Sequence, residues 1–290
     1  MKLMKFSLLL SLCLLATTPF FAQANTDKKI DPKTEKVYRV KPLLTGGLGL
    51  GGMIVGTIGI ERLRDKPLVT DNELQGLSRE DVPGFDRWGL DQDLDNREDA
   101  EHASDLVFNG AVLLPLTLFV SKKFRKDWLD ITSMYIATHA LNSTTYGFGP
   151  FGAGVVDRIR PIAYYPDADY GLRSQGNARN SFFSGHVSTT AVGTFFFTKV
   201  LSDYNPQWMG WQRALAFGAA AIPPLYVAVQ RVRALKHFPS DTAVGFAVGA
   251  FFGVMTPQVH KNWQRKHRTK LSIGGGYSGG VGNGGFVLTF

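Results

Sequence analysis

Apolar stretches alternate with polar segments along the chain, and their spacing sets the expected architecture. The clearest stretches lie near residues 106–120, 187–201, 214–229 and 242–256, and a weaker one covers 130–147. None of them alternates apolar and polar residues with a period of two, so each predicts a helix rather than a strand. We therefore expect an all-α fold in the form of a helical bundle.

Two glycine-rich regions modify this pattern. Residues 43–60 are apolar but contain many glycines, which predicts either a packed or an interfacial helix whose glycines allow close backbone contact. The tail 271–290 is also rich in glycine, and its last five residues alternate in the manner of a strand. We expect this C-terminal tail to be β-like, as one strand or a short hairpin.

Whether the apolar stretches cross a membrane depends on their length and on the charges beside them. Most are slightly shorter than the ~20 apolar residues that a span needs, and a mean hydropathy of −0.04 is low for a polytopic protein. Basic clusters at 122–126 and 260–270 close two of the stretches, and the positive-inside rule places both in the cytoplasm. About five spans, of which 106–120 is the first, satisfy this placement. The loops 148–186 and 230–241 then face the periplasm.

The first residues are typical of an export signal. Two lysines precede the apolar run 6–15, and Ala-Gln-Ala at 22–24 offers small residues at a cleavage point. We expect residues 1–24 to be a signal peptide, with an uncleaved anchor helix as the alternative. If the signal is cleaved, a further span at 43–60 would put both basic clusters outside, so we predict that 43–60 does not span.

Composition narrows the partners and the chemistry. The formal net charge is +8, but the basic residues cluster beside apolar segments instead of following one helical face, which favours a membrane over nucleic acid as partner. The only cysteine, Cys13, lies in the predicted signal, so the mature chain would have no disulfide, thiolate metal ligand or cysteine nucleophile.

The chain then divides into four predicted segments. A signal peptide (1–24) precedes a polar region with a glycine-rich apolar helix (25–104). A helical domain (105–257) carries the chemistry, and a basic segment with the glycine-rich tail (258–290) follows. A soluble helical periplasmic domain remains the alternative to membrane embedding.

Residues suited to catalysis lie in the two loops that are predicted to share one side. Arg160 comes first, and Ser184-Gly185-His186 follows just before an apolar helix, where backbone N–H groups and the helix dipole favour an anion. Arg231 then stands six residues before His237, and Asp241 four residues after it. On one helical face, the carboxylate would accept a hydrogen bond from one ring nitrogen and leave the other as a base or nucleophile. The two arginines offer forked donors to phosphate oxygens, so the set indicates a phosphate substrate.

This arrangement resembles the type 2 phosphatidic acid phosphatase superfamily, which includes bacterial class A acid phosphatases and vanadium haloperoxidases. The shared features are Arg-Pro at 160–161, Ser-Gly-His at 184–186, and an arginine with histidine six residues later and aspartate four after that. The resemblance covers roughly residues 105–257.

The resemblance also implies roles for these residues. His237 would attack phosphorus to form a phosphohistidine, Asp241 would orient it, and His186 would protonate the leaving group and later activate water. The phosphate would be held by Arg160, Arg231, Ser184 and the backbone of Gly185. Neither a metal ion nor a cofactor is implied.

Three positions depart from the family pattern. Ala153 stands seven residues before Arg160, where the family has a lysine, while Phe183 replaces a proline and Gln230 a serine. The missing lysine matters most, because it would bind the phosphate. Three other cations are candidate replacements, the first of them only if its backbone is not helical: Arg158, Arg173 and Arg179.

We therefore expect a phosphatase of the bacterial inner membrane with its active site facing the periplasm. Its substrate would be a phosphomonoester or pyrophosphate of a membrane lipid, such as phosphatidic acid, phosphatidylglycerol phosphate, undecaprenyl pyrophosphate or lipid A. Only the apolar helices beside the site favour a lipid. Three alternatives remain: a soluble periplasmic acid phosphatase, a haloperoxidase that binds vanadate, and an envelope protein that binds lipid phosphates without turnover. The sequence predicts no oligomeric state.

Overall fold

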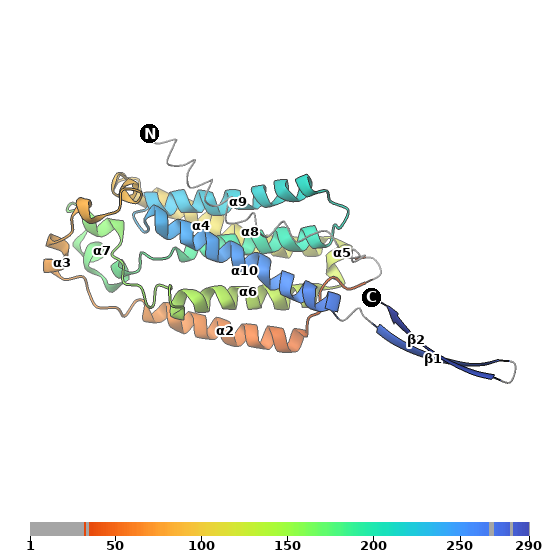
Figure 1. Ribbon diagram of the computed structural model, residues 1–290. Helices are drawn as coiled ribbons and strands as arrows, with labels where there is room; N and C mark the ends of the chain where they lie inside the picture. The colour runs from red at the N-terminus through yellow and green to blue at the C-terminus, as the bar shows by residue number, and fades with distance from the viewer. Residues whose placement is uncertain (1–31, 33–34, 267–269, 279–280, 290) are drawn as a thin grey trace.

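The computed structural model describes residue 32 and residues 35–266, 270–278 and 281–289; the predicted signal peptide lies outside these residues. Within them, six long helices run side by side as one bundle (Figure 1). The all-α bundle expected from the apolar pattern is confirmed. The six helices are α2 (Pro42–Arg62), α4 (Arg97–Leu113), α6 (Trp128–Phe148), α8 (Gly185–Asp203), α9 (Gly210–Arg233) and α10 (Pro239–Lys266).

The two ends of the bundle differ in what connects the helices. One end, the loop end, carries the segments 63–96, 149–184 and 234–238, which include the short helices α3 (Asp71–Gln75) and α7 (Tyr170–Ser174) (Figure 1). The opposite end, the basic end, carries α5 (Lys122–Arg125) and the end of α10 (Figure 1). The two basic clusters therefore share one end, as predicted, as far as the described residues reach. Short 3-10 helices complete the connections: Arg79–Asp81, Arg87–Leu90, Leu114–Val120, Pro161–Tyr164 and Gly176–Arg179.

Helix α8 forms the centre of the bundle. It packs against α10, α9, α4 and α6, and 14 of its 19 residues are buried. Although its neighbours shield it, α8 contains many serines and threonines. Several of their hydroxyls donate to carbonyls of the preceding turn, for example Thr190 Oγ1 to His186 O at 2.8 Å.

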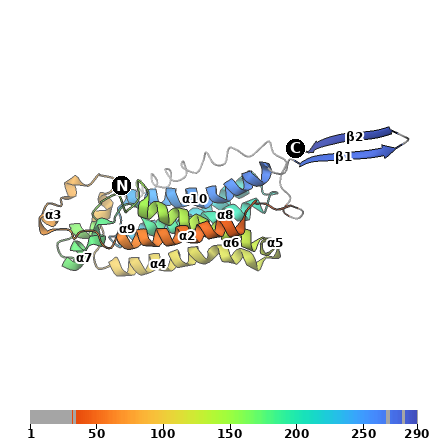
Figure 2. The ribbon, with the colours of Figure 1, turned by 90° about the horizontal axis from the view of Figure 1, so that it is seen from below.

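The glycines of α2 permit close packing against α6, as the sequence predicted. A Cβ at Gly49 would lie 2.9 Å from the backbone of Ala137, and one at Gly59 would lie 3.0 Å from the Cα of Gly147. The residue numbers rise along both helices from the first pair to the second, so α2 and α6 run parallel. Both helices therefore cross the bundle from the basic end to the loop end (Figures 1 and 2).

The set of candidate membrane spans differs from the predicted five. Among the described residues, four helices are long and apolar enough to cross a membrane: α2, α4 with the 3-10 turn after it, α9 and α10. The prediction that 43–60 does not span therefore lacks support. Only 17% of the most apolar stretch of α2 is buried, whereas α6 and α8, both predicted as spans, are more polar because they lie further inside the bundle.

The C-terminal tail forms the expected hairpin. Strands β1 (Lys270–Ser278) and β2 (Val281–Thr289) pair antiparallel in one continuous register, from Lys270 opposite Thr289 to Ser278 opposite Val281. Helix α4 runs across the predicted segment boundary at 104/105; that division stays a prediction.

Candidate active site

The loop between α9 and α10 presents His237 at the loop end of the bundle. Leu235 adopts a positive φ of 58°, a conformation that ends α9 sharply and costs free energy unless its surroundings hold it. Helix α10 begins only at Pro239, so His237 precedes the helix and does not share a helical face with Asp241. The expected i, i+4 pairing is therefore wrong.

A backbone carbonyl fixes the ring of His237 instead. Nδ1 of His237 lies 2.5 Å from the carbonyl oxygen of Ser181, and the side chain is buried. Because a carbonyl only accepts hydrogen bonds, Nδ1 carries the proton and Nε2 keeps its lone pair. The ring is thus held in the tautomer that a nucleophile needs.

Asp241 acts on His237 through Ser181. Its Oδ2 accepts hydrogen bonds from the Ser181 hydroxyl at 2.6 Å and from the Phe238 amide at 2.7 Å. These bonds fix Ser181, whose carbonyl binds the imidazole, and Phe238, which follows His237. Asp241 is therefore a positioning residue that orients His237 indirectly, rather than by the direct hydrogen bond that was predicted.

Arg158 completes the support behind the histidine. Its guanidinium pairs with Asp241, bonds the Ser240 hydroxyl at 2.8 Å and pairs with Asp86 at 2.7 Å. The backbone at Arg158 is extended and forms an isolated bridge with Asn180, which allows the side chain to reach α10. The neighbouring carboxylates raise the pKa of Arg158 against the opposing effect of burial. A chain of contacts thus runs from Asp86 to His237.

The N-terminus of α8 lies beside this network. The Ser184 hydroxyl caps the helix by accepting from the Val187 amide at 3.5 Å, and the Ser184 amide donates to the Asp241 carbonyl at 3.0 Å. A Cβ at Gly185 would lie 3.3 Å from the ring of Tyr146, so glycine allows that ring to cover the helix end. The first amides of a helix attract anions, as the sequence analysis expected.

Two buried arginines face the same space. Arg160 is 8% exposed and its Nε donates to the Asn180 carbonyl at 3.3 Å. Arg231 is 4% exposed and contacts the Ser104 hydroxyl at 3.4 Å, yet its buried Nε has no hydrogen-bond partner in the part of the chain that the structure describes. Because an unpaired buried donor is costly, this arginine is suited to receive an anion.

These charges set the protonation of the histidine. Burial lowers the pKa of His237 well below its usual value, and the positive charges of Arg160 and Arg231 lower it further. His237 is consequently neutral at physiological pH, with Nε2 available for attack.

His186 lies at the mouth of the site on the first turn of α8. Its Nε2 is 3.2 Å from Asp105 of α4, and its ring packs on Phe108 at 4.8 Å between centroids. Asp105 is also 3.8 Å from Arg231. The partly exposed histidine thus has a carboxylate beside it.

All seven predicted site residues therefore meet at the loop end. Residues 131–265 match the model of the PAP2 superfamily. This segment belongs to the PAP2 superfamily. The match begins in α6 and ends in α10, so α4 lies outside it although Asp105 of α4 lies beside His186.

A curated protein is also similar to part of the chain. The chain is 34% identical over 108 residues to a protein of Rhizobium johnstonii named Lipid A 1-phosphatase, and the match covers 35% of this chain and 37% of the relative. The chain thus spans little more than a third of that relative's length. No solved structure matches the chain.

The lysine missing from the PAP2 pattern has no replacement among the three candidates. Ala153 is fully buried. Arg158 holds Asp241, Arg173 donates to the carbonyls of Ala163 and Pro166, and Arg179 pairs with Glu73 and Asp157.

Sequence reasoning missed several residues that shape the site. Lys236 directly precedes His237 and was visible as an additional cation, and Glu101 and Asp105 are acidic residues one helical turn apart on α4. Asp86 and Ser181 gave no signal, because their roles depend on contacts across the fold. Among the described residues, no group of three or more His, Cys, Asp or Glu side chains forms a metal-binding cluster.

Proposed function

We propose that this chain is a phosphatase that hydrolyses a phosphomonoester or pyrophosphate of a membrane lipid through a phosphohistidine. The observation that carries the proposal is the setting of His237. Its Nδ1 is bound to a carbonyl, its Nε2 is free and neutral, and two buried arginines and a helix N-terminus surround it.

The first step is attack of His237 Nε2 on phosphorus. The N–P bond forms while the bond from phosphorus to the ester oxygen breaks, and His186 gives a proton to that oxygen. Arg160, Arg231 and the amides that begin α8 stabilise the charge on the phosphoryl oxygens. These groups supply the positive charge, so we expect activity to persist in the presence of a metal chelator.

The second step releases phosphate. His186, now neutral, accepts a proton from water as the water attacks the phosphohistidine, and the N–P bond breaks to restore His237. Asp241, Ser181 and Arg158 hold the imidazole in place throughout both steps.

A lipid substrate and a membrane location are supported by the surface of the bundle. Along α2, apolar side chains stand exposed, among them Leu43 at 92%, Leu48 at 69% and Ile54 at 64%. So large an apolar surface is unusual on a soluble monomer, which disfavours the soluble acid phosphatase. The name of the Rhizobium relative makes lipid A one of the candidate substrates.

We further propose that the loop end faces the periplasm. Basic residues gather at the opposite end, in α5, at the end of α10 and in the segment that leads into α2, and the positive-inside rule places that end in the cytoplasm. If α2 spans, the start of α2 and the end of α10 both lie on the cytoplasmic side, which is incompatible with a cleaved export signal before residue 25.

Topology can be measured by labelling single cysteines, because Cys13 is the only native one. After Cys13→Ser, a membrane-impermeant maleimide applied to intact spheroplasts should label Asp167→Cys at the loop end but not Lys122→Cys at the basic end. The reverse pattern would place the active site in the cytoplasm.

The alternative of lipid-phosphate binding without turnover rests on Ala153, where the PAP2 lysine is missing. Phosphate release from a panel of lipid and soluble phosphates, by detergent-purified protein with chelator present, separates the two functions. Release from lipids that disappears in His237→Ala supports the phosphatase. Release from no substrate leaves binding alone, and equal release by the variant removes His237 as nucleophile.

A further inference from the structure

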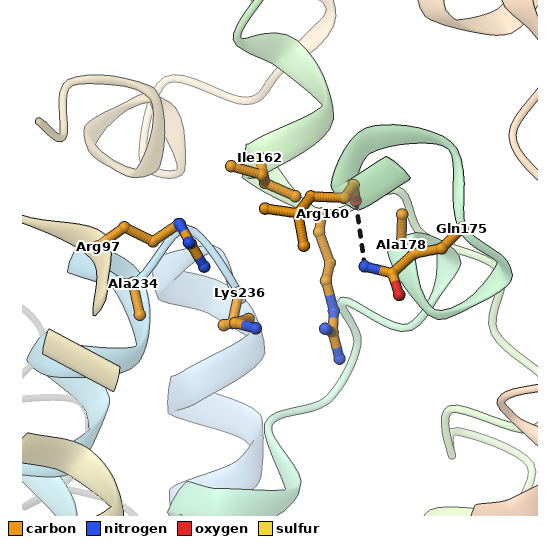
Figure 3. Close-up of a pocket in the computed structure, with 8 residues that line it drawn as sticks. Arg97, Arg160, Ile162, Gln175, Ala178, Ala234 and Lys236 are labelled. Carbon is orange, nitrogen blue, oxygen red and sulfur yellow. Dashed lines mark hydrogen bonds between the residues drawn. The ribbon is translucent and has the colours of Figure 1, made fainter. Parts of the chain in front are cut away.

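A cationic pocket adjoins the phosphate site on the side of Arg160. Three positive side chains line it, Arg97 from α4, Lys236 from the α9–α10 loop, and Arg160 itself (Figure 3). Gln175 adds a polar group, and Ile162 and Leu172 form part of an apolar wall. In Figure 3 the amine of Lys236 points toward the guanidinium of Arg160. The pocket therefore continues the positive surface of the catalytic site.

One carboxylate, that of Glu101, serves as counterion to several of these cations at once. It lies 3.0 Å from Lys236, 3.7 Å from Arg97 and 4.0 Å from Arg231. Arg97 also pairs with the exposed Glu98 at 2.6 Å. With Arg160 and with Asp105, which lies 3.8 Å from Arg231, the cluster contains four cations and three carboxylates, so it retains positive charge for a ligand.

The position of Lys236 ties the pocket to the chemistry. It directly precedes His237, and its side chain is 19% exposed. Arg160 belongs both to the pocket and to the group of charges around His237. An anion in the pocket would consequently be a close neighbour of a phosphoryl group at Nε2 of His237.

The cavity holds about 10 Å³, so a phosphate can enter only when the flexible side chains of Arg97 and Lys236 turn outward. We propose that these side chains then bind the phosphate that stays on the lipid when the substrate is a lipid diphosphate. The proposal rests on the proposed phosphatase function and selects one substrate class for it. Arg97 and Lys236 would supply positive charge beside the leaving group. This charge would add to that of the two arginines in a chain that lacks the PAP2 lysine.

The reaction balances with the residues already placed. His237 Nε2 forms a bond to the terminal phosphorus, the bond from that phosphorus to the bridging oxygen breaks, and its electron pair stays on the bridging oxygen. The lipid monophosphate thus leaves with one additional negative charge, which Lys236 and Arg97 stabilise. His186 stays neutral in this step, because the monophosphate leaves as an anion and needs no proton. Water then attacks the phosphohistidine, His186 accepts a proton from it and releases that proton to solvent, and inorganic phosphate leaves.

The test compares two probes with the same lipid chain, farnesyl diphosphate and farnesyl monophosphate, in one detergent. We expect wild-type protein to prefer the diphosphate in kcat/KM, and Lys236→Ala to reduce that preference at least about tenfold, the effect of losing a charged hydrogen bond. Lys236→Arg should retain most of the preference, which guards against a general folding defect. Lys122→Ala, an exposed lysine at the basic end, is the matched control.

Glu101→Gln provides a second arm of opposite sign. Removal of the shared counterion should lower KM for the diphosphate, because the ligand no longer competes with the carboxylate. An unchanged preference in Lys236→Ala, or a wild-type enzyme that hydrolyses only the monophosphate, would overturn the pocket assignment and leave the phosphatase standing. Failure to hydrolyse either probe, together with every other lipid phosphate, would instead remove the proposed function.

Discussion

Buried charges occur at both ends of the bundle, but the buried arginines of the loop end have only long or few contacts. At the basic end, Asp203 accepts from Lys199, from Lys261 at 2.6 Å and from the Tyr38 hydroxyl at 3.0 Å. At the loop end, the buried Nε of Arg231 has no partner among the described residues, and Arg160 has only a carbonyl at 3.3 Å. A fully paired network stabilises a fold, whereas weakly paired donors of positive charge are ready for an anionic ligand.

The paired network should matter for stability and not for chemistry. Asp203→Ala leaves the buried Lys199, the partly buried Lys261 and the buried Tyr38 without their acceptor, so we expect the free energy of unfolding to fall by about 3–5 kcal/mol. Denaturation in detergent measures this loss, and Asp167→Ala on an exposed loop is the control. A stable variant with reduced activity would contradict the contrast between the ends.

The weakly paired cations of the loop end should show the opposite behaviour. Arg231→Met removes a donor that faces the proposed phosphate site, so we expect kcat to fall about 10²–10³-fold. The thermal unfolding temperature should change little, because Arg231 lies as far as 3.8 Å from Asp105 and 4.0 Å from Glu101. Kinetics and thermal unfolding of the same preparation decide this. Loss of stability in proportion to activity would make Arg231 a structural residue like Asp203.

Arg158 lies between these cases, because it is paired and yet supports the nucleophile. Arg158→Ala frees Asp241 and, through Ser181, the ring of His237, so we expect kcat to fall about 10- to 100-fold through misplacement, with little change in KM. Arg158→Lys should recover part of the rate. A rise in KM without loss of kcat would show that Arg158 binds phosphate directly.

Helices α8 and α10, which run between the two ends, pack closely through glycine. A Cβ at Gly249 of α10 would lie 2.0 Å from the Ser188 carbonyl oxygen of α8, whereas one at Gly218 of α9 meets nothing within 4 Å. Gly249→Ala should therefore destabilise the protein by about 1–3 kcal/mol, and Gly218→Ala should stabilise it by up to about 1 kcal/mol. Equal effects in thermal unfolding would contradict the assigned packing.

The smallest effect concerns pH. A protonated His237 has no lone pair on Nε2, so activity is lost as pH falls through its pKa, and burial and the arginines place that loss below the ordinary histidine value. Arg160→Gln removes one repelling charge, raises the pKa of His237 and should move the acid limb of kcat/KM upward by up to about one unit. The same substrate for both proteins cancels its own titration. A downward shift would contradict the assigned nucleophile.

Much of the catalytic set could be predicted because it lies in short, ordered motifs. Arg160, Ser184-Gly185-His186, Arg231 and His237 converge as expected, since each stands at the loop-end terminus of a helix or in the loop beside it. The role of Asp241 was misjudged because Pro239 starts α10 after His237, and a spacing of four residues carries meaning only within a helix.

Other features depend on contacts that the sequence does not display. The Asp86–Arg158 pair joins residues 72 positions apart, so no local pattern indicated it. The prediction that α2 does not span came from counting membrane crossings. That count assumed a cleaved signal and included α6 and α8 as spans. Glycine pairs with α6 instead place α2 along the full bundle, with its apolar side chains outward.

The central claim is that His237 becomes phosphorylated during turnover. The most direct measurement is a millisecond acid-free quench of the protein with lipid diphosphate, followed by mass spectrometry of the peptide that contains His237, in wild type and in His186→Ala, where hydrolysis of the intermediate is slowed. We predict a phosphoryl group on His237 that is stable in base and labile in acid, and that accumulates in the variant. Normal phosphate release by the wild type without a label on His237, or with the label on another residue, would contradict the account.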